Sequence, residues 1–135
     1  MIKITLITVT YNAEKLLQPT LDSVFRQNYA ALEHIVIDGA STDDTAVVAK
    51  DYMERSFASD NGHEVRLLVE PDNGIYDAMN EGISRCTGDV VGILNSDDYF
   101  TSDDVLQNAF LKIWKSLDSF QGKSSLSTWL YRIAI

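Results

Sequence analysis

Strand-like and helix-like segments alternate regularly along the first hundred residues of this chain. Segments rich in β-branched and other apolar residues occur at residues 3–9, 33–38, 65–69 and 89–94. Between them, apolar residues recur at helical spacing, and turn residues such as glycine separate the segments. Parallel strands need a crossover connection, and such crossovers are right-handed. The order therefore predicts an α/β fold, with a parallel sheet of about four strands and helices on both faces.

The charge of the chain changes sign near residue 105. Through Val105 the sequence holds 7 basic and 19 acidic residues, a net of −12, whereas from Leu106 onward it holds 4 basic and 1 acidic, a net of +3. The whole chain carries −9, which disfavours a nucleic-acid partner. The change of sign predicts two segments of different character, residues 1–104 and residues 105–135.

Compartment signals are few. No apolar run approaches the ~20 residues that a transmembrane helix needs, so no membrane span is expected. The first ten residues alternate apolar residues with threonine, which is typical of a buried strand and not of a signal peptide. Cys86 is the single cysteine and cannot form an internal disulfide, so a cytoplasmic location is expected.

Each predicted strand ends in polar residues, which would meet at one edge of a parallel sheet. These residues are, strand by strand, Thr10, Tyr11 and Asn12; Asp38; Glu70, Asp72 and Asn73; and Asn95, Ser96, Asp97 and Asp98. A tyrosine ring can stack on a nucleobase, and a carboxylate can accept a hydrogen bond from a ring N–H. Adjacent aspartates can hold a divalent cation, which in turn neutralises a diphosphate. The pattern favours a nucleoside diphosphate bound through a metal ion.

Polar residues at strand ends are also ordinary loop residues, so each of them has a simpler interpretation. We interpret Asp43 and Asp44 as charges at the start of a helix, with Ser41 or Thr42 as its N-cap. Asn12 is in the same way a candidate cap for the first helix.

Three stretches together resemble the family 2 glycosyltransferases of the GT-A fold. They are ITLITVTYNAEKLLQPTLDSVFRQNY, HIVIDGASTDDT and EPDNGIYDAMNEGISRCTGDVVGILNSDDYF, and the resemblance covers about residues 2–104. It implies a Rossmann-like half domain that binds a nucleotide-diphospho-sugar, with a UDP-sugar as the expected donor. Such enzymes transfer the sugar to an acceptor hydroxyl with inversion, usually with Mn²⁺ or Mg²⁺.

The resemblance assigns roles to the polar residues of this edge. Thr10, Tyr11 and Asn12 match the family's first nucleotide-contacting loop. Asp38 matches an acidic residue that contacts the uracil ring or its equivalent, although the second acid often found beside it is Gly39 here.

The run Asn95-Ser96-Asp97-Asp98 matches the family's D-x-D region, with Asn95 in place of the first acid. The resemblance therefore implies that Asp97 and Asp98 contact the ribose, the metal and the diphosphate. Asp77 and Asn80, in the helix after the DNG turn, are weaker candidates for the donor side.

The acceptor half and its general base have no counterpart in the sequence. In the family both lie well beyond the D-x-D region, and only 37 residues follow Asp98. We therefore assign no catalytic residue, and we expect a donor-binding unit without transferase activity. Whether the chain is an enzyme stays open at this point.

The last 30 or so residues resemble something different, namely region 2 of extracytoplasmic-function sigma factors. The likeness rests on FLKIW and STWLYRIA, and it implies a two-helix tail over residues 105–135. The apolar residues also allow a plainer interpretation, in which two amphipathic helices bury Trp114 and Trp129 on the sheet. The alternatives to nucleotide-sugar binding are thus a module that binds RNA polymerase core, or a chimeric structural protein without activity.

Overall fold

The computed structural model describes residues 1–71, 73–120 and 130–132. Its elements, in chain order, are β1 (Ile4–Thr10), α1 (Glu14–Phe25), β2 (Leu32–Asp38), α2 (Thr45–Ser59), β3 (Glu64–Val69), α3 (Ile75–Arg85), β4 (Val90–Ile93), α4 (Val105–Phe120) and β5 (Leu130–Arg132). The strands form one parallel sheet in the order β3-β2-β1-β4-β5. The predicted α/β fold is therefore confirmed, and β5 is a strand that the sequence analysis did not expect.

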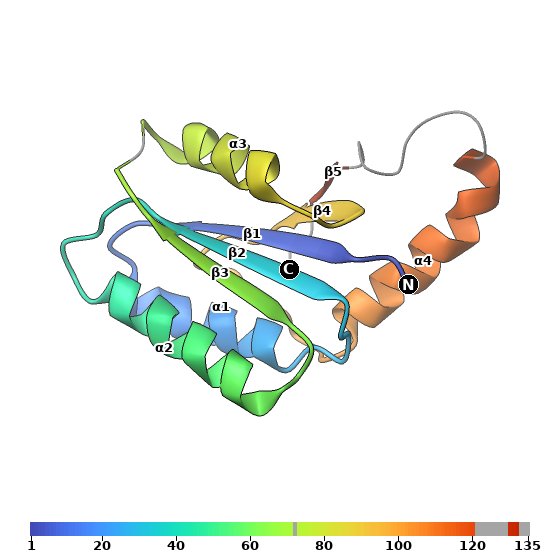
Figure 1. Cartoon of the computed structure of the whole chain (residues 1–135), viewed down its shortest axis with the longest axis horizontal. Helices are drawn as coiled ribbons and strands as arrows, with labels where there is room; N and C mark the ends of the chain where they lie inside the picture. Colours follow the sequence, from blue (N-terminus) through green and yellow to red (C-terminus); the bar gives the residue numbers. More distant parts are fainter. Residues whose placement is uncertain (72, 121–129, 133–135) are drawn as a thin grey trace.

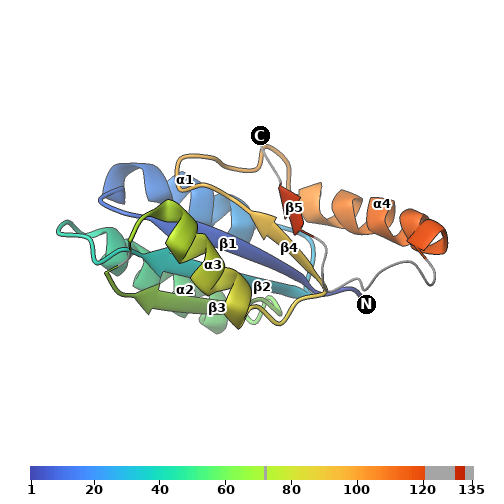
Figure 2. The ribbon, with the colours of Figure 1, turned by 90° about the horizontal axis from the view of Figure 1, so that it is seen from above.

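Helices cover both faces of the sheet, as Figures 1 and 2 show. Helices α1 and α2 pack on one face, where Leu17 and Leu21 meet Val36 and Tyr52. Helix α3 packs on the other face, where Ala78 meets buried isoleucines of β1 and β2. The alternating side chains of the central strands thus fill two separate apolar layers, which is the pattern expected for strands buried on both faces.

Helix α4 packs at the amino end of the sheet on the α1 side, and it corrects one expectation. Its contact is made by Leu106 and Ile113, which are buried, and Phe110, which packs against the same cores. Trp114 was expected to be buried on the sheet, but it is 59% exposed. Its ring contacts that of Phe110, with the ring centroids 6.0 Å apart. Trp129 lies outside the described residues.

The expected second helix of the tail is also wrong where the structure describes it. Residues 130–132 pair with β4 in parallel, with Leu130 opposite Val91 and Arg132 opposite Ile93. The free edge of β4 offers unpaired N–H and C=O groups, and pairing with them is an alternative to helix formation. The rest of the expected second helix lies outside the described residues.

Candidate functional site

The strand order creates a switch point at the carboxyl end of β1. The chain adds β2 and β3 on one side of β1, and then crosses back to place β4 on the other side. β1 pairs with β2 along its whole length, but with β4 only as far as Ile7, opposite Ile93. The last three residues of β1 therefore extend beyond the end of β4. In open α/β sheets, ligands bind beyond the carboxyl ends of the strands at such a point.

The loop after β1 presents Tyr11 to solvent. The Tyr11 side chain is 59% exposed, whereas Thr10 before it is 2% exposed. The Thr10 hydroxyl is a buried side-chain oxygen without a hydrogen-bond partner among the described residues, although buried polar groups are normally satisfied. Asn12 follows with a φ of 47°, in the left-handed region. An exposed ring beside an unsatisfied hydroxyl is compatible with a binding edge.

Asp38 ends β2 directly opposite Thr10, so the sheet brings these two predicted site residues together. Asp38 is fully buried. Its carboxylate accepts hydrogen bonds from the Ser41 amide, at 3.0 Å, and from the Ser41 hydroxyl, at 2.5 Å. In this conformation the carboxylate is therefore occupied by its own loop and does not face solvent.

The expected helix caps are wrong. Helix α2 has Asp44 at its N-cap position, and Ser41 is bound to Asp38 instead. Asp43 does serve the helix start as expected, because it accepts hydrogen bonds from the hydroxyl and amide of Thr45. Those bonds, the one from the hydroxyl first, lower the pKa of Asp43. Asn12 does not cap α1, whose N-cap position is Ala13.

The loop after β4 holds the acidic pair. Asp98 closes a turn by donating its amide to the Asn95 carbonyl at 3.1 Å, and the Asn95 side chain donates to an Asp98 carboxylate oxygen at 3.3 Å. From α1, the buried hydroxyl of Thr20 binds the carbonyls of Ser96, at 3.0 Å, and of Asp98. Thr20 thus holds this loop against α1, a role that no sequence motif indicated. Asp97 is exposed and Asp98 is half-buried.

The carboxylates of Asp97 and Asp98 suit a cation that has further ligands from outside the protein. Neither Asp97 nor Asp98 forms an ion pair among the described residues. Within the same part of the chain, no group of three or more His, Cys, Asp or Glu residues is placed to hold a metal ion alone. A hard cation such as Mg²⁺ commonly binds one or two carboxylates together with substrate phosphates and water. The two aspartates therefore suit a metal–diphosphate complex better than a free ion.

The remaining described candidates belong to the segment from the end of β3 to the first half of α3. Glu70, Asn73, Asp77 and Asn80 are all exposed. Asp77 accepts a long hydrogen bond of 3.5 Å from the Asn73 amide. Asp72 lies outside the described residues.

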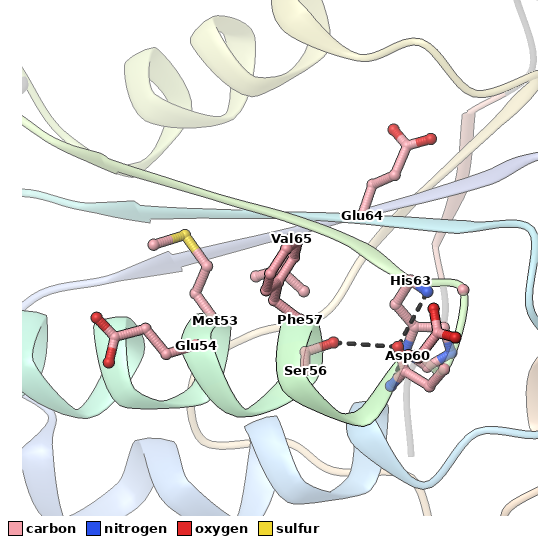
Figure 3. Close-up of a pocket in the computed structure, with 10 residues that line it drawn as sticks. Met53, Glu54, Ser56, Phe57, Asp60, His63, Glu64 and Val65 are labelled. Carbon is pink, nitrogen blue, oxygen red and sulfur yellow. Dashed lines mark hydrogen bonds between the residues drawn. The ribbon is translucent and has the colours of Figure 1, made fainter.

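A hollow in the surface lies at the opposite edge of the sheet. A groove of about 800 Å³ lies between the end of α2 and the start of β3, and Figure 3 shows residues that line it. Phe57, which is 88% exposed, lines it together with Met53 and Val65. His63 on its floor is held by the Tyr29 carbonyl at 3.0 Å and by Asn61 at 3.1 Å. None of the predicted site residues lines this groove.

Among the described helices, none has the length and apolar character to cross a membrane.

Comparisons with known proteins agree with the fold. The model of the family described as "Glycosyl transferase family 2" matches residues 5–120. The chain therefore belongs to glycosyl transferase family 2. It is 37% identical over 125 residues to an uncharacterized glycosyltransferase of Mycobacterium tuberculosis, an alignment that covers 92% of this chain and 42% of that protein. The chain thus spans less than half the length of this relative.

Two solved structures show the same fold. Residues 1–349 of TarS from Staphylococcus aureus, crystallised with UDP-GlcNAc, match 85% of this chain and 32% of theirs, with 26% identity and a TM-score of 0.71. The mannosyltransferase PcManGT from Pyrobaculum calidifontis, in complex with GDP-Man and Mn²⁺, matches 81% of this chain and 31% of its own. Its identity is 30% and its TM-score is 0.70. The GT-A resemblance is therefore confirmed.

The family match also bears on the tail. It runs to residue 120 and so includes α4, which the sequence analysis had grouped with a sigma-like tail. The sigma-factor likeness has no support from these comparisons. The division of the chain at residue 104 stays a prediction.

Proposed function

We propose that this chain binds a nucleotide-diphospho-sugar together with Mn²⁺ or Mg²⁺, as the donor-binding part of an inverting glycosyltransferase. The observation that carries the proposal is the pair Asp97 and Asp98 beside the switch point, with no cation paired to either among the described residues. A diphosphate and two carboxylates repel each other, so a divalent cation held by Asp97 and Asp98 would neutralise part of this charge and favour binding.

The remaining residues of the edge divide the ligand between them. Tyr11 is exposed and supplies a face for the nucleobase. Thr10, Asn12 and Asp38 form the base end of the site, and Asp97 and Asp98 form the ribose and metal end. A UDP-sugar is the proposed donor, and the TarS complex with UDP-GlcNAc supports that choice. The GDP-Man complex of PcManGT makes a guanine nucleotide the competing donor.

Transfer of the sugar to an acceptor does not belong to this proposal. The chain spans 42% of the mycobacterial relative, and no residue described here is assigned as the general base.

The single thiol, Cys86, is compatible with our prediction of a cytoplasmic location.

A thermal-shift panel of UDP, GDP, CDP and ADP, each with Mn²⁺ and with EDTA, tests the proposal. UDP with Mn²⁺ should raise the unfolding temperature most, and saturation at 100-fold over Kd corresponds to about 2.7 kcal/mol of stabilisation. Asp98→Asn should remove the metal-dependent part, whereas the matched control Asp51→Asn, an exposed acid of α2, should not. No shift with any nucleotide at millimolar concentration would contradict the proposal.

A further inference from the structure

The loops after β1 and β2 are joined through one hydroxyl group. The Ser41 hydroxyl donates to the buried Asp38 carboxylate and accepts a hydrogen bond from the Asn12 amide at 2.8 Å. In return, the Asn12 side-chain oxygen accepts a hydrogen bond from the Thr42 amide at 2.8 Å. Each loop therefore supplies both a donor and an acceptor to the other. We call this set, formed by Asp38, Ser41, Asn12 and Thr42, the loop clasp.

The clasp holds backbone that an isolated loop would avoid. Asn12 has a φ of 47° and Ala40 a φ of 62°, and both lie in the left-handed region. Asparagine tolerates that region, whereas alanine adopts it only at a cost in free energy, because its Cβ comes close to the following carbonyl oxygen. Conformations of this kind persist where the surroundings over-determine them, and they concentrate at functional sites. Here the hydrogen bonds of the clasp are the over-determining contacts.

Tyr11 lies between the end of β1 and the left-handed Asn12. The residue is 59% exposed. The backbone on either side of Tyr11 sets where its side chain leaves the chain. On the β1 side the backbone is fixed by the sheet, where the Gly39 amide donates to the Thr10 carbonyl at 3.0 Å. On the other side it is fixed by the Asn12 amide bond to Ser41. Ser41 is thus the contact that completes the support of the ring.

We propose that Ser41 is a positioning residue for nucleotide binding, which acts through Tyr11 by holding the loop clasp closed. The inference rests on the proposed function and adds to it a residue that the sequence analysis had treated as a helix cap. In this scheme Asp38 acts on the base end of the site indirectly. Its buried carboxylate holds Ser41 in place, and Ser41 holds the loop clasp closed.

A double-mutant cycle on the full chain tests this. The Kd for UDP with Mn²⁺ is measured by calorimetry for the parent, Ser41→Ala, Tyr11→Ala and the double variant. Ser41→Thr keeps the hydroxyl. Ser59→Ala is the matched control, because the Ser59 hydroxyl donates to the Ser56 carbonyl at the far end of α2. In the ligand-free chain, exchange of the Asn12 amide with deuterium reports the clasp directly.

Ser41→Ala should weaken UDP binding by about fivefold to tenfold and accelerate exchange of the Asn12 amide. Ser41→Thr should restore both, and Ser59→Ala should change neither. The double variant should bind no more weakly than Tyr11→Ala alone, because a residue that acts through Tyr11 has nothing left to position.

Losses that multiply in the double variant, or parent-like binding by Ser41→Ala, would overturn the inference while leaving the proposed function intact. Tighter binding by Ser41→Ala would also overturn it, since Ser41 would then compete with the base for Asp38. If the parent chain binds no nucleotide, the proposed function fails, and the positioning role fails with it.

Discussion

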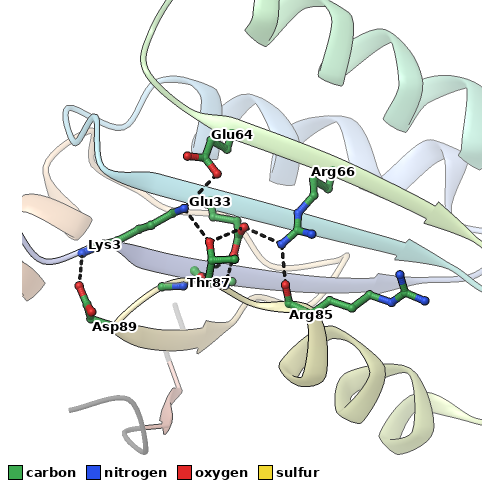
Figure 4. A network of polar contacts seen from close by, with 9 residues as sticks. Lys3, Glu33, Glu64, Arg66, Arg85, Thr87 and Asp89 are labelled. Atoms are coloured by element: carbon green, nitrogen blue, oxygen red, sulfur yellow. Dashed lines mark hydrogen bonds and ion pairs between the residues drawn. The ribbon is translucent and has the colours of Figure 1, made fainter. Parts of the chain in front are cut away.

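The two edges of this sheet treat their acidic residues in opposite ways. At the amino edge, the Glu33 side chain is 1% exposed, yet it is fully partnered (Figure 4). It accepts hydrogen bonds from the Thr5 hydroxyl at 2.8 Å, the Thr87 amide at 2.8 Å and the Arg66 guanidinium at 2.6 Å. Burial opposes ionisation of Glu33, but the bonds from Thr87, Thr5 and Arg66 outweigh it and lower its pKa.

Lys3 extends the same network across the start of the sheet. Its ammonium group binds Glu64 at 3.0 Å and the Thr87 hydroxyl at 2.6 Å, and its amide donates to Asp89 at 2.9 Å. The acids of this edge are therefore bound to cations or N–H groups of the chain itself. Such an edge contributes to stability and leaves little capacity for a ligand.

The carboxyl edge is different, because Asp38, Asp97 and Asp98 form no ion pair among the described residues. Asp38 is satisfied by the hydroxyl and amide of Ser41, and Asp98 by a single amide group. The acids that this fold leaves without cations are those at which we expect a cation to bind.

The largest expected effect is at the amino edge. Glu33→Ala removes the shared acceptor and leaves the Thr87 amide and Thr5 hydroxyl without it, so the free energy of unfolding should fall by roughly 2–4 kcal/mol. Glu64→Ala is the control, because its side chain is 61% exposed and should contribute less than about 1 kcal/mol. Denaturant titration measures both. Equal losses for the two variants would remove the distinction between a buried and a surface acid at this edge.

As the pH falls, the fold should lose stability first through His34 and only later through Glu33. His34, the next residue of β2, is fully buried between the Thr8 hydroxyl at 2.8 Å and the Tyr52 hydroxyl at 2.7 Å. Burial, with a smaller contribution from the nearby His63, lowers the pKa of His34 to about 3. Below its ordinary value of about 6.5, the unfolded chain binds a proton that the folded chain does not, so stability is lost as the pH falls.

The expected loss from His34 is about 1.4 kcal/mol per pH unit below about pH 6.5. Glu33, with its lowered pKa, should keep its contribution until the solution is more acid than about pH 4.5. Denaturant titrations at about pH 7, 5.5 and 4 separate the loss of stability due to His34 from the loss due to Glu33. His34→Gln should make the first loss smaller. His63, whose pKa is also lowered by burial, will leave a residual slope. A parent stability that does not change between about pH 7 and 5.5 would contradict the buried neutral histidine.

The smallest effect on stability is expected at the carboxyl edge. Asp97 is exposed and makes no ion pair among the described residues, so Asp97→Asn should change the free energy of unfolding by less than about 0.5 kcal/mol. The same variant should weaken binding of UDP with Mn²⁺. A large stability loss without any loss of binding would reverse the roles given to the two edges.

The elements were predictable because apolar periodicity is a local property. The expected strand at 33–38 is Leu32–Asp38, and the expected helix at 46–57 is Thr45–Ser59. The position of Asp38, Asp97 and Asp98 at one edge followed from parallel pairing alone.

What could not be predicted depends on contacts between segments distant in sequence. Thr20 is pinned to the loop of Asp98, 78 residues away, and Ser41 to Asn12, 29 residues away. A serine before a helix is a common cap, so local rules assigned Ser41 to α2 and missed its bond to another loop. The strand at 130–132 was missed for the same reason, because the edge of β4 decides its conformation.

We expect the carboxyl edge to take up a divalent cation only together with a nucleotide. Electron paramagnetic resonance of free Mn²⁺ tests it directly, because the sharp signal of the hydrated ion disappears on binding. The signal in the presence of the chain should stay near that of the free ion without nucleotide. It should fall, beyond what UDP alone causes, when chain and UDP are both present, and Asp98→Asn should abolish that extra fall. An equal fall for the parent and Asp98→Asn, or a full fall without UDP, would contradict the account.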